Sequence, residues 1–413
     1  MLRVKVGREN FCRRFCKGHQ MHKNTQLDDT LCVIPPETPL EGFASLAVPV
    51  YRASTIVFPD AATYRSRAGR APDGYTYGLS GTPTARALER QLASLHNAER
   101  AIVVPSGQAA ISIAMLTILK EGDHLLVADN VYPPVKEFAQ DILRNLGIET
   151  EYFDPTELSD LAGKFREGRT RLVWVESPGS TTMEICDVPS IARLCKASGA
   201  LLGCDNTWAT GLLCKPLDLG VDIVAEALTK YVGGHSDILL GAIVLRDMNL
   251  YGTVRNTLGC LGVGVSPDEC SLALRGLQTL GLRLRHVGTV SEEFADRLSG
   301  NGSYTVLHPS LPTSPGHDLW RRDFKGSSGV FSLRLEGVPA EAIDRALDKL
   351  QTFAIGASWG GTRSIIVPLV IAADRHVMRS TESTTHLRIS IGLENEDHLW
   401  TDLQQMLRSL RLQ

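Results

Sequence analysis

A lysine and an acid near the middle of this chain have the types and settings of a covalent-cofactor site. Lys230 lies in a turn of glycine and hydroxyl-bearing residues, and Thr229 precedes it. Asp205 ends the apolar segment 201–204 upstream. A lysine amine bonds to the aldehyde of pyridoxal phosphate (PLP), an acid keeps the pyridine nitrogen protonated, and a hydroxyl can bind the phosphate. Together these residues predict a PLP site.

Each of these residues also has a structural explanation. Lysines in loops are usually solvated, and an Asp before Asn-Thr commonly caps a turn. However, an apolar segment enters the turn, and Gly233, Gly234 and further apolar residues follow it. Such a dry setting lowers the pKa of an amine and makes it nucleophilic. We therefore expect Lys230 and Asp205 to act together.

Two further apolar segments are followed by residues that could hold a cofactor. Ser106, Gly107 and Gln108 open a predicted helix, where backbone N–H groups and the helix dipole favour a phosphate. Tyr132 follows the apolar segment 124–128 and could stack on an aromatic ring. An ordinary capped helix and a loop anchor are the alternatives. The chain has neither a Walker A loop nor a G-x-G-x-x-G motif, which disfavours nucleotide chemistry.

Arg388 and Tyr77 are weaker candidates. Arg388 shares the polar face of a predicted strand with Ser390, and arginine suits a substrate carboxylate. Taken alone, this strand favours an arginine that faces solvent. Tyr75 and Tyr77 lie in a stretch rich in glycine and proline, where surface packing is the alternative explanation.

The elements that position these residues alternate between short apolar strands and amphipathic helices. Such alternation predicts a mostly parallel sheet covered on both faces. Ligand sites in such sheets lie at the carboxyl ends of the strands, where Ser106, Tyr132, Ser177, Asp205 and Lys230 all occur. The predicted strands are 101–105, 124–128, 148–153, 172–176, 201–205, 222–227 and 238–245; the predicted helices are 106–119, 133–146, one capped by Thr156, and 189–198.

The last third of the chain has a different pattern. After a long helical stretch at 268–298, the segments 331–335 and 387–391 alternate with period two. Predicted helices at 340–350 and 396–410 lie between and after them. This pattern predicts a smaller α+β domain with an antiparallel sheet.

Composition limits the classes of function. The 413 residues carry a net charge of −3, which gives no case for a nucleic-acid or membrane partner. No apolar segment approaches the roughly 20 residues that span a bilayer. The nine cysteines show no paired spacing, so we expect neither disulfides nor a metal site, and a reducing, cytoplasmic compartment. Residues 1–20 are basic and could be a transit peptide or precede a true start at Met21; we expect them to be disordered.

From about residue 40 to its end, the chain resembles the Cys/Met-metabolism PLP enzymes of fold type I, and most closely their β-lyase branch. The resemblance implies a PLP-dependent transferase-like fold with a seven-stranded sheet. It also implies an arm (1–80) that reaches a neighbouring subunit, a PLP-binding domain (81–275) and a C-terminal α+β domain (276–413). Its most specific segments are YGLSGTPT (77–84), ESPGSTTMEICDVP (176–189), DNTWATG (205–211), TKYVGGHSD (229–237), SWGG (358–361) and LRISIGLE (387–394).

The resemblance also implies a role for each candidate residue. Lys230 carries the cofactor and moves protons, a role that Tyr132 could share, and Asp205 meets the pyridine nitrogen. Tyr132 stacks on the ring, and Tyr77 enters from another subunit of a homotetramer. The remaining implied cofactor contacts are Gly107, Gln108, Thr207 and Thr229, and the implied substrate contacts are Arg388, Ser358 and Trp359.

Two positions depart from the family pattern. Leu79 stands where an arginine is common, and Ala227 where a hydroxyl residue is common. Both changes remove phosphate contacts, so we expect weaker PLP retention unless another basic residue, such as Arg86, compensates.

The resemblance implies α,β-elimination of a small amino-acid thioether, L-cystathionine, to homocysteine, pyruvate and ammonia in methionine biosynthesis. Two alternatives remain open. The same scaffold could perform γ-elimination or γ-replacement, or the chain could be a binding or regulatory protein without catalysis.

Overall fold

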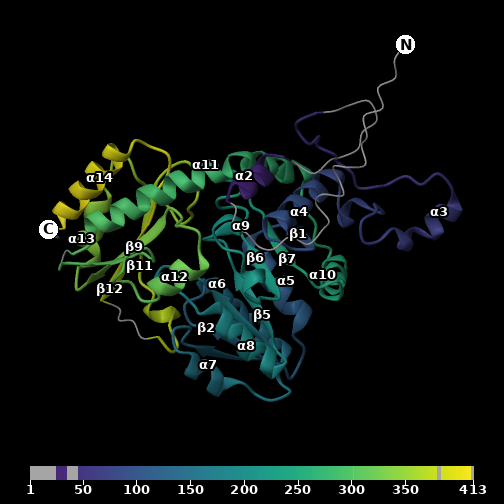
Figure 1. Ribbon diagram of the computed structural model, residues 1–413, viewed down its shortest axis with the longest axis horizontal. Helices are drawn as coiled ribbons and strands as arrows, with labels where there is room; N and C mark the ends of the chain where they lie inside the picture. Colours follow the sequence, from purple (N-terminus) through teal and green to yellow (C-terminus); the bar gives the residue numbers. More distant parts are fainter. Residues whose placement is uncertain (1–24, 35–44, 301, 379–382, 411–413) are drawn as a thin grey trace, which may run out of the picture.

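The structure is a computed structural model that describes residues 25–34, 45–300, 302–378 and 383–410. It contains a seven-stranded sheet and a second, smaller sheet of five strands, each with accompanying helices (Figure 1). The predicted α/β fold class is therefore confirmed. The expectations for residues 1–20 lie outside the described residues.

The larger sheet has the strand order β1-β7-β6-β5-β4-β2-β3. Its pairs are parallel except those of β7, which runs antiparallel to both β1 and β6. The strands of this sheet are mostly buried, because helices cover a sheet of this kind on both faces. Its strands are β1 (Arg100–Val104), β2 (His124–Ala128), β3 (Glu149–Phe153), β4 (Thr170–Glu176), β5 (Leu201–Asp205), β6 (Ile223–Glu226) and β7 (Gly241–Leu245).

The helices between these strands begin at recognisable caps. The Ser106 and Asp187 side chains accept N–H bonds at the starts of α5 and α8. The predicted helix 133–146 is continuous but changes from an α-helix to a π-turn and a 3₁₀ turn. The helices of this part are α4 (Pro83–Leu95), α5 (Gly107–Ile118), α6 (Pro133–Phe138), α7 (Leu158–Lys164), α8 (Val188–Ser198), α9 (Thr210–Leu213) and α10 (Met248–Leu261).

The predicted helix cap at Thr156 is wrong. The N–H and hydroxyl of Thr156 both donate to Asp154 Oδ1, at 2.9 and 2.6 Å. This local turn delays the helix, and α7 begins two residues later with Glu157 as its N-cap residue.

A long helix, α11 (Pro267–Leu298), runs from the larger sheet to the smaller one (Figure 1). Phe294 on α11 packs edge-on against Trp400 of α14, with ring centroids 5.0 Å apart. The smaller sheet has the order β10-β11-β12-β9-β8, and β9 and β12 are antiparallel as predicted. Its elements are β8 (Thr305–Leu307), α12 (His317–Asp323), β9 (Val330–Glu336), α13 (Ala340–Leu347), β10 (Ala354–Ile355), β11 (Ile365–Leu369), β12 (Thr384–Ser390) and α14 (Glu396–Ser409).

Residues 45–82 form an arm that extends from the side of the larger sheet and contains the short helix α3 (Ala61–Arg65) (Figure 1). Several of its apolar side chains are exposed, including those of Leu46, Val57 and Tyr77. Helix α2 (Thr25–Val33) packs against α11 and α4. Among the helices of the described ranges, none is long and apolar enough to cross a bilayer.

Candidate active site

Acidic side chains gather at the carboxyl edge of the larger sheet. Glu176 ends β4, Asp205 ends β5, and the two are directly paired in the parallel register. Glu226 ends β6, and the turn that carries Lys230 follows it. The sheet therefore places the lysine turn and the predicted acid along one edge.

Lys230 is held in a half-buried position. Its Nζ donates to Ser358 Oγ at 2.9 Å and lies 5.2 Å from the centroid of the Trp359 ring. Burial, together with the positive charge of Arg388, lowers the pKa of Lys230 to about 8, although Asp205 acts in the opposite direction. The neutral form of the amine is therefore far more populated near pH 7 than in an ordinary lysine, although the protonated form still predominates.

Asp205 is connected to the lysine turn through Thr207. Asp205 Oδ1 accepts bonds from the hydroxyl (2.5 Å) and the N–H (2.8 Å) of Thr207. The same hydroxyl accepts from the Ala227 N–H at 2.9 Å. Burial raises the pKa of Asp205 despite these bonds, so a positively charged partner such as a pyridinium would stabilise its ionised form.

Tyr132 lies at the start of α6. Its backbone is held by Glu176, a residue that the sequence analysis did not single out. The Tyr132 N–H donates to Glu176 Oε2 at 2.7 Å. Burial and the neighbouring Asp205 raise the pKa of Glu176 well above its ordinary value. Glu176 ends a strand just as Asp205 does, which is the signal that could have identified it.

Arg388 faces this site instead of bulk solvent. It is partly buried, it donates to the Ala357 carbonyl, and its charge acts on both Lys230 and Tyr132. It forms no ion pair with any carboxylate in the described part of the chain. Its guanidinium is therefore suited to the carboxylate of an amino acid.

The loop with Ser358 and Trp359 approaches the lysine turn closely because Gly360 has no side chain. Gly360 has φ +82°, and a Cβ there would lie 3.1 Å from the backbone of Lys230 and Tyr231. The Trp359 ring packs on Tyr231 with centroids 5.4 Å apart. Lys230, Ser358, Trp359 and Arg388 therefore come together from two distant parts of the chain.

The predicted phosphate seat is the amino end of α5. The Gly107 and Gln108 N–H groups open this helix and have no acceptor within it. A Cβ on Gly107 would lie 2.4 Å from the Cβ of Ala227, so glycine allows α5 to approach the lysine turn. The Thr229 hydroxyl lies nearby, but it donates to the Leu240 carbonyl and accepts from its N–H.

These groups fit PLP. The Gly107 and Gln108 N–H groups would hold the phosphate, Asp205 would hold the pyridine nitrogen, and Lys230 would bond to the aldehyde. The buried carboxyl of Asp205, raised in pKa, is the observation that most favours a cationic ring at this place.

Tyr77 and Arg86 do not join this group within one chain. Tyr77 is half exposed on the arm, where its backbone forms an isolated bridge with Thr55. Arg86 is buried, and its guanidinium binds Glu89 (2.9 Å) and the Ser80 carbonyl (2.8 Å). Because the Arg86 guanidinium is already bound by these groups, the structure does not support the expectation that Arg86 compensates for the absence of an arginine at position 79.

Metal and disulfide chemistry are not supported in the described ranges. No cluster of three or more His, Cys, Asp or Glu side chains there could hold a metal ion. The seven cysteines of these ranges are unpaired, and six of them are buried.

Comparisons with known proteins agree with this geometry. A family model described as "Cys/Met metabolism PLP-dependent enzyme" matches residues 29–408. A cystathionine beta-lyase from Bordetella avium is 39% identical over 378 residues, covering 90% of this chain and 94% of that protein. An L-alanine/L-glutamate racemase from Wolbachia pipientis wMel is 38% identical over 384 residues, covering 89% and 93%.

A solved structure is similar over nearly the whole fold. The cystathionine gamma synthase from Xanthomonas oryzae pv. oryzae, in complex with cystathionine, superposes with a TM-score of 0.84 at 29% identity. The match covers 93% of this chain and 98% of the other. The relatives therefore share a scaffold and differ in the reactions their names describe.

Proposed function

Because the chain belongs to the Cys/Met-metabolism PLP-dependent enzymes, we propose that it catalyses the α,β-elimination of L-cystathionine. The overall reaction consumes one water and gives homocysteine, pyruvate and ammonia. The chain is an enzyme and its cofactor is PLP. The choice of β-elimination and of cystathionine is our proposal, since relatives with other reactions share the scaffold.

When bound, PLP supplies an electron-withdrawing ring that stabilises negative charge at the substrate Cα. Asp205 would keep that ring cationic, and Thr207 orients the Asp205 carboxylate through its hydroxyl and N–H. Tyr132 offers an aromatic face at the same edge of the sheet, and Glu176 fixes its backbone.

The proton transfers are assigned to Lys230. Its amine, with a pKa of about 8, can take the Cα proton in its neutral form. The leaving sulfur then takes a proton either from Lys230 or from Tyr132. Ser358, which accepts from Lys230 Nζ, can hold the amine in place between these steps.

The substrate carboxylate is assigned to Arg388, with Ser358 and Trp359 beside it. Arg388 has no carboxylate partner of its own among the described residues, and it lies close enough to lower the pKa of Lys230. The observation that carries the proposal is that Lys230 and Arg388 converge at the carboxyl edge of the larger sheet, and that neither forms an ion pair with a described residue.

The test is an assay of the purified, PLP-loaded protein with L-cystathionine that follows both keto acids. We expect pyruvate and homocysteine, no 2-oxobutyrate, and loss of activity and of the bound-cofactor absorbance in Lys230→Ala. Formation of 2-oxobutyrate would overturn the β assignment and favour γ-chemistry.

Racemisation is a second candidate, favoured by the Wolbachia relative. Lys230 and Tyr132 offer two groups that could exchange the Cα proton of L-alanine or L-glutamate. Chiral analysis after incubation with each of these amino acids tests this candidate. We expect their racemisation to be slow compared with the formation of pyruvate from L-cystathionine.

We also propose that the active enzyme is a homotetramer in which the arm (1–80) of one subunit completes the site of another. The exposed apolar side chains of residues 45–82 support this assembly, as does the position of Tyr77 outside its own site. The PLP-binding part (81–275) and the C-terminal part (276–413) would then provide Lys230 and Arg388 respectively.

A further inference from the structure

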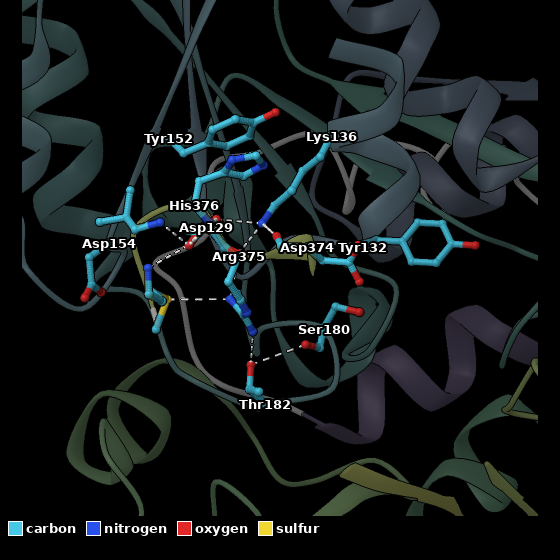
Figure 2. Close-up of polar contacts among 12 residues, drawn as sticks. Asp129, Tyr132, Lys136, Tyr152, Asp154, Ser180, Thr182, Asp374, Arg375 and His376 are labelled. Carbon is cyan, nitrogen blue, oxygen red and sulfur yellow. Dashed lines mark hydrogen bonds and ion pairs between the residues drawn. The ribbon is translucent and has the colours of Figure 1, made fainter. Parts of the chain in front are cut away.

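A buried carboxylate joins the two halves of the molecule beside the candidate site. Asp129 is fully buried, and its Oδ1 lies 2.6 Å from Lys136 Nζ. The same carboxylate accepts the successive N–H groups of His376, Val377 and Met378 at 3.0, 2.8 and 2.7 Å. Figure 2 shows these contacts converging on Asp129. One side chain of the larger sheet therefore holds three amides of the C-terminal part.

Arg375 makes a second connection across the same boundary. Its guanidinium donates to the Asp129 carbonyl at 2.6 Å and to Thr182 Oγ1 at 2.5 Å (Figure 2). Thr182 in turn donates to Glu184 at 2.6 Å. Arg375 thus binds two separate loops of the larger sheet.

Aromatic packing adds a further contact between the same two parts of the chain. The His376 ring stacks on Tyr152 of β3, with centroids 3.9 Å apart and planes within 5°. Lys136 Nζ also donates to the carbonyls of Asp129 and Asp374. We call Asp129, Lys136, Arg375 and the 376–378 backbone the Asp129 clamp.

Within the clamp, the charges of Asp129 and Lys136 compensate each other. Burial by itself would raise the pKa of Asp129. The bonds from Lys136 and from the backbone N–H groups have a larger, opposite effect, so the pKa of Asp129 lies below its ordinary value. Burial lowers the pKa of Lys136, and Asp129 opposes that effect. Buried ion pairs add little stability relative to apolar residues, and they serve best where they fix one arrangement among several.

The clamp is placed to align two parts of the site. Asp129 and Lys136 flank Tyr132, which projects away from the cluster in Figure 2. Residues 375–378 lie between β11 and β12, and β12 carries Arg388. The segment around Tyr132 and the segment that precedes β12, the strand of Arg388, are therefore both bound to the Asp129 carboxylate.

We propose that the Asp129 clamp is a positioning device that sets Arg388 relative to Tyr132, so that carboxylate binding and the environment of the cofactor ring depend on it together. This inference rests on the proposed roles of Arg388 and Tyr132. Arg375 is assigned a positioning role, through its bonds to the Asp129 carbonyl and to Thr182.

The test compares Arg375→Ala with Arg334→Ala in the PLP-loaded enzyme. Both arginines line the same recess of about 320 Å³, but the Arg334 side chain binds Thr305 and Glu336 of the smaller sheet. The readouts are the visible circular dichroism of bound PLP and the absorbance change on titration with glycine. Glycine has the α-carboxylate but no leaving group, so its binding does not depend on which elimination the enzyme performs.

For Arg375→Ala we expect glycine binding about tenfold weaker and a changed visible dichroism, because the clamp no longer couples the two segments. Arg334→Ala should match the parent in both readouts. Arg375→Lys, which can still reach one acceptor, should recover part of the glycine affinity.

The double variant Asp129→Asn with Lys136→Met gives a second test without leaving a buried charge unpaired. It should reproduce both changes seen in Arg375→Ala. A lower melting temperature with parental glycine affinity and dichroism, in either variant, would overturn the proposal. If the parent forms no pyruvate, the proposed function fails, but these two readouts still decide the clamp.

Discussion

At the scale of single residues, the site works through charges that are only partly compensated. Lys230 lies between Arg388, which lowers its pKa, and Asp205, which raises it. Asp205 itself lacks a cationic side-chain partner at hydrogen-bonding distance among the described residues, and its pKa is raised. These charges support the proposal that Lys230 is reactive and that a cationic ring binds beside Asp205.

The first prediction concerns the proton affinity of Lys230. In the cofactor-free protein, its acetylation by acetic anhydride should rise with pH through a midpoint of about 8, because only the neutral amine reacts. Asp205→Asn removes a charge that favours the protonated amine, so the midpoint should fall. Arg388→Leu removes a charge that disfavours it, so the midpoint should rise. Mass spectrometry of the Lys230 peptide measures all three, and shifts of the same sign would contradict this account.

The second prediction concerns Leu79. The family resemblance implies an arginine at the position of Leu79, so Leu79→Arg should add a phosphate contact and tighten PLP binding by about tenfold. Equilibrium dialysis followed by cofactor absorbance measures the change. Leu79→Met is the matched control and should retain the parental affinity. Equal affinity in all three proteins would show that the missing arginine is unimportant.

At the scale of elements, the start of α5 and the lysine turn form one unit. They approach so closely that a Cβ on Gly107 would overlap Ala227. The proposed phosphate site and the lysine turn are therefore fixed relative to each other by direct packing.

The third prediction is that Gly107→Ala pushes these elements apart. Overpacking of this kind costs about 1–3 kcal/mol, and PLP affinity should fall by about tenfold because the helix start moves from the phosphate. Thermal unfolding of the cofactor-free protein and PLP titration measure the two effects. Gly163→Ala, at a helical site with nothing within 4 Å, should change neither by much. If Gly107→Ala binds PLP with the parental affinity, the start of α5 does not contact the cofactor.

The strands of the larger sheet were predictable because buried parallel strands are short apolar segments with few alternatives. Asp205 and Lys230 were predictable because they follow such segments. Thr156 was misread because Asp154 competes for its N–H, an interaction that helix-cap preferences do not include. The Asp129 clamp could not be predicted, since its partners are up to 249 residues apart in the sequence and include backbone amides of no particular residue type.

At the scale of the whole molecule, the site is shared between distant parts of the chain and, in our proposal, between subunits. Lys230 comes from the larger sheet and Arg388 from β12, while Tyr77 remains exposed on the arm. A single chain therefore brings together the lysine and the arginine but leaves the arm tyrosine unused.

The fourth prediction tests this sharing by complementation. Tyr77→Ala and Lys230→Ala should each reduce the elimination rate strongly when expressed alone. Co-expressed, they should recover about a quarter of the parental activity, because random pairing gives one intact site in half of the dimers. A mixture no more active than the separate variants would place Tyr77 outside the neighbouring site.

The position of β7 beside β6 has a consequence for thermal unfolding and for loss of the bound cofactor. The turn with Lys230 leaves β6 and returns as β7, and both strands lie in the interior of the larger sheet. Fraying, which starts at edges and termini, does not reach this turn. Bleaching of the bound chromophore and melting of the central sheet should therefore occur as one cooperative event.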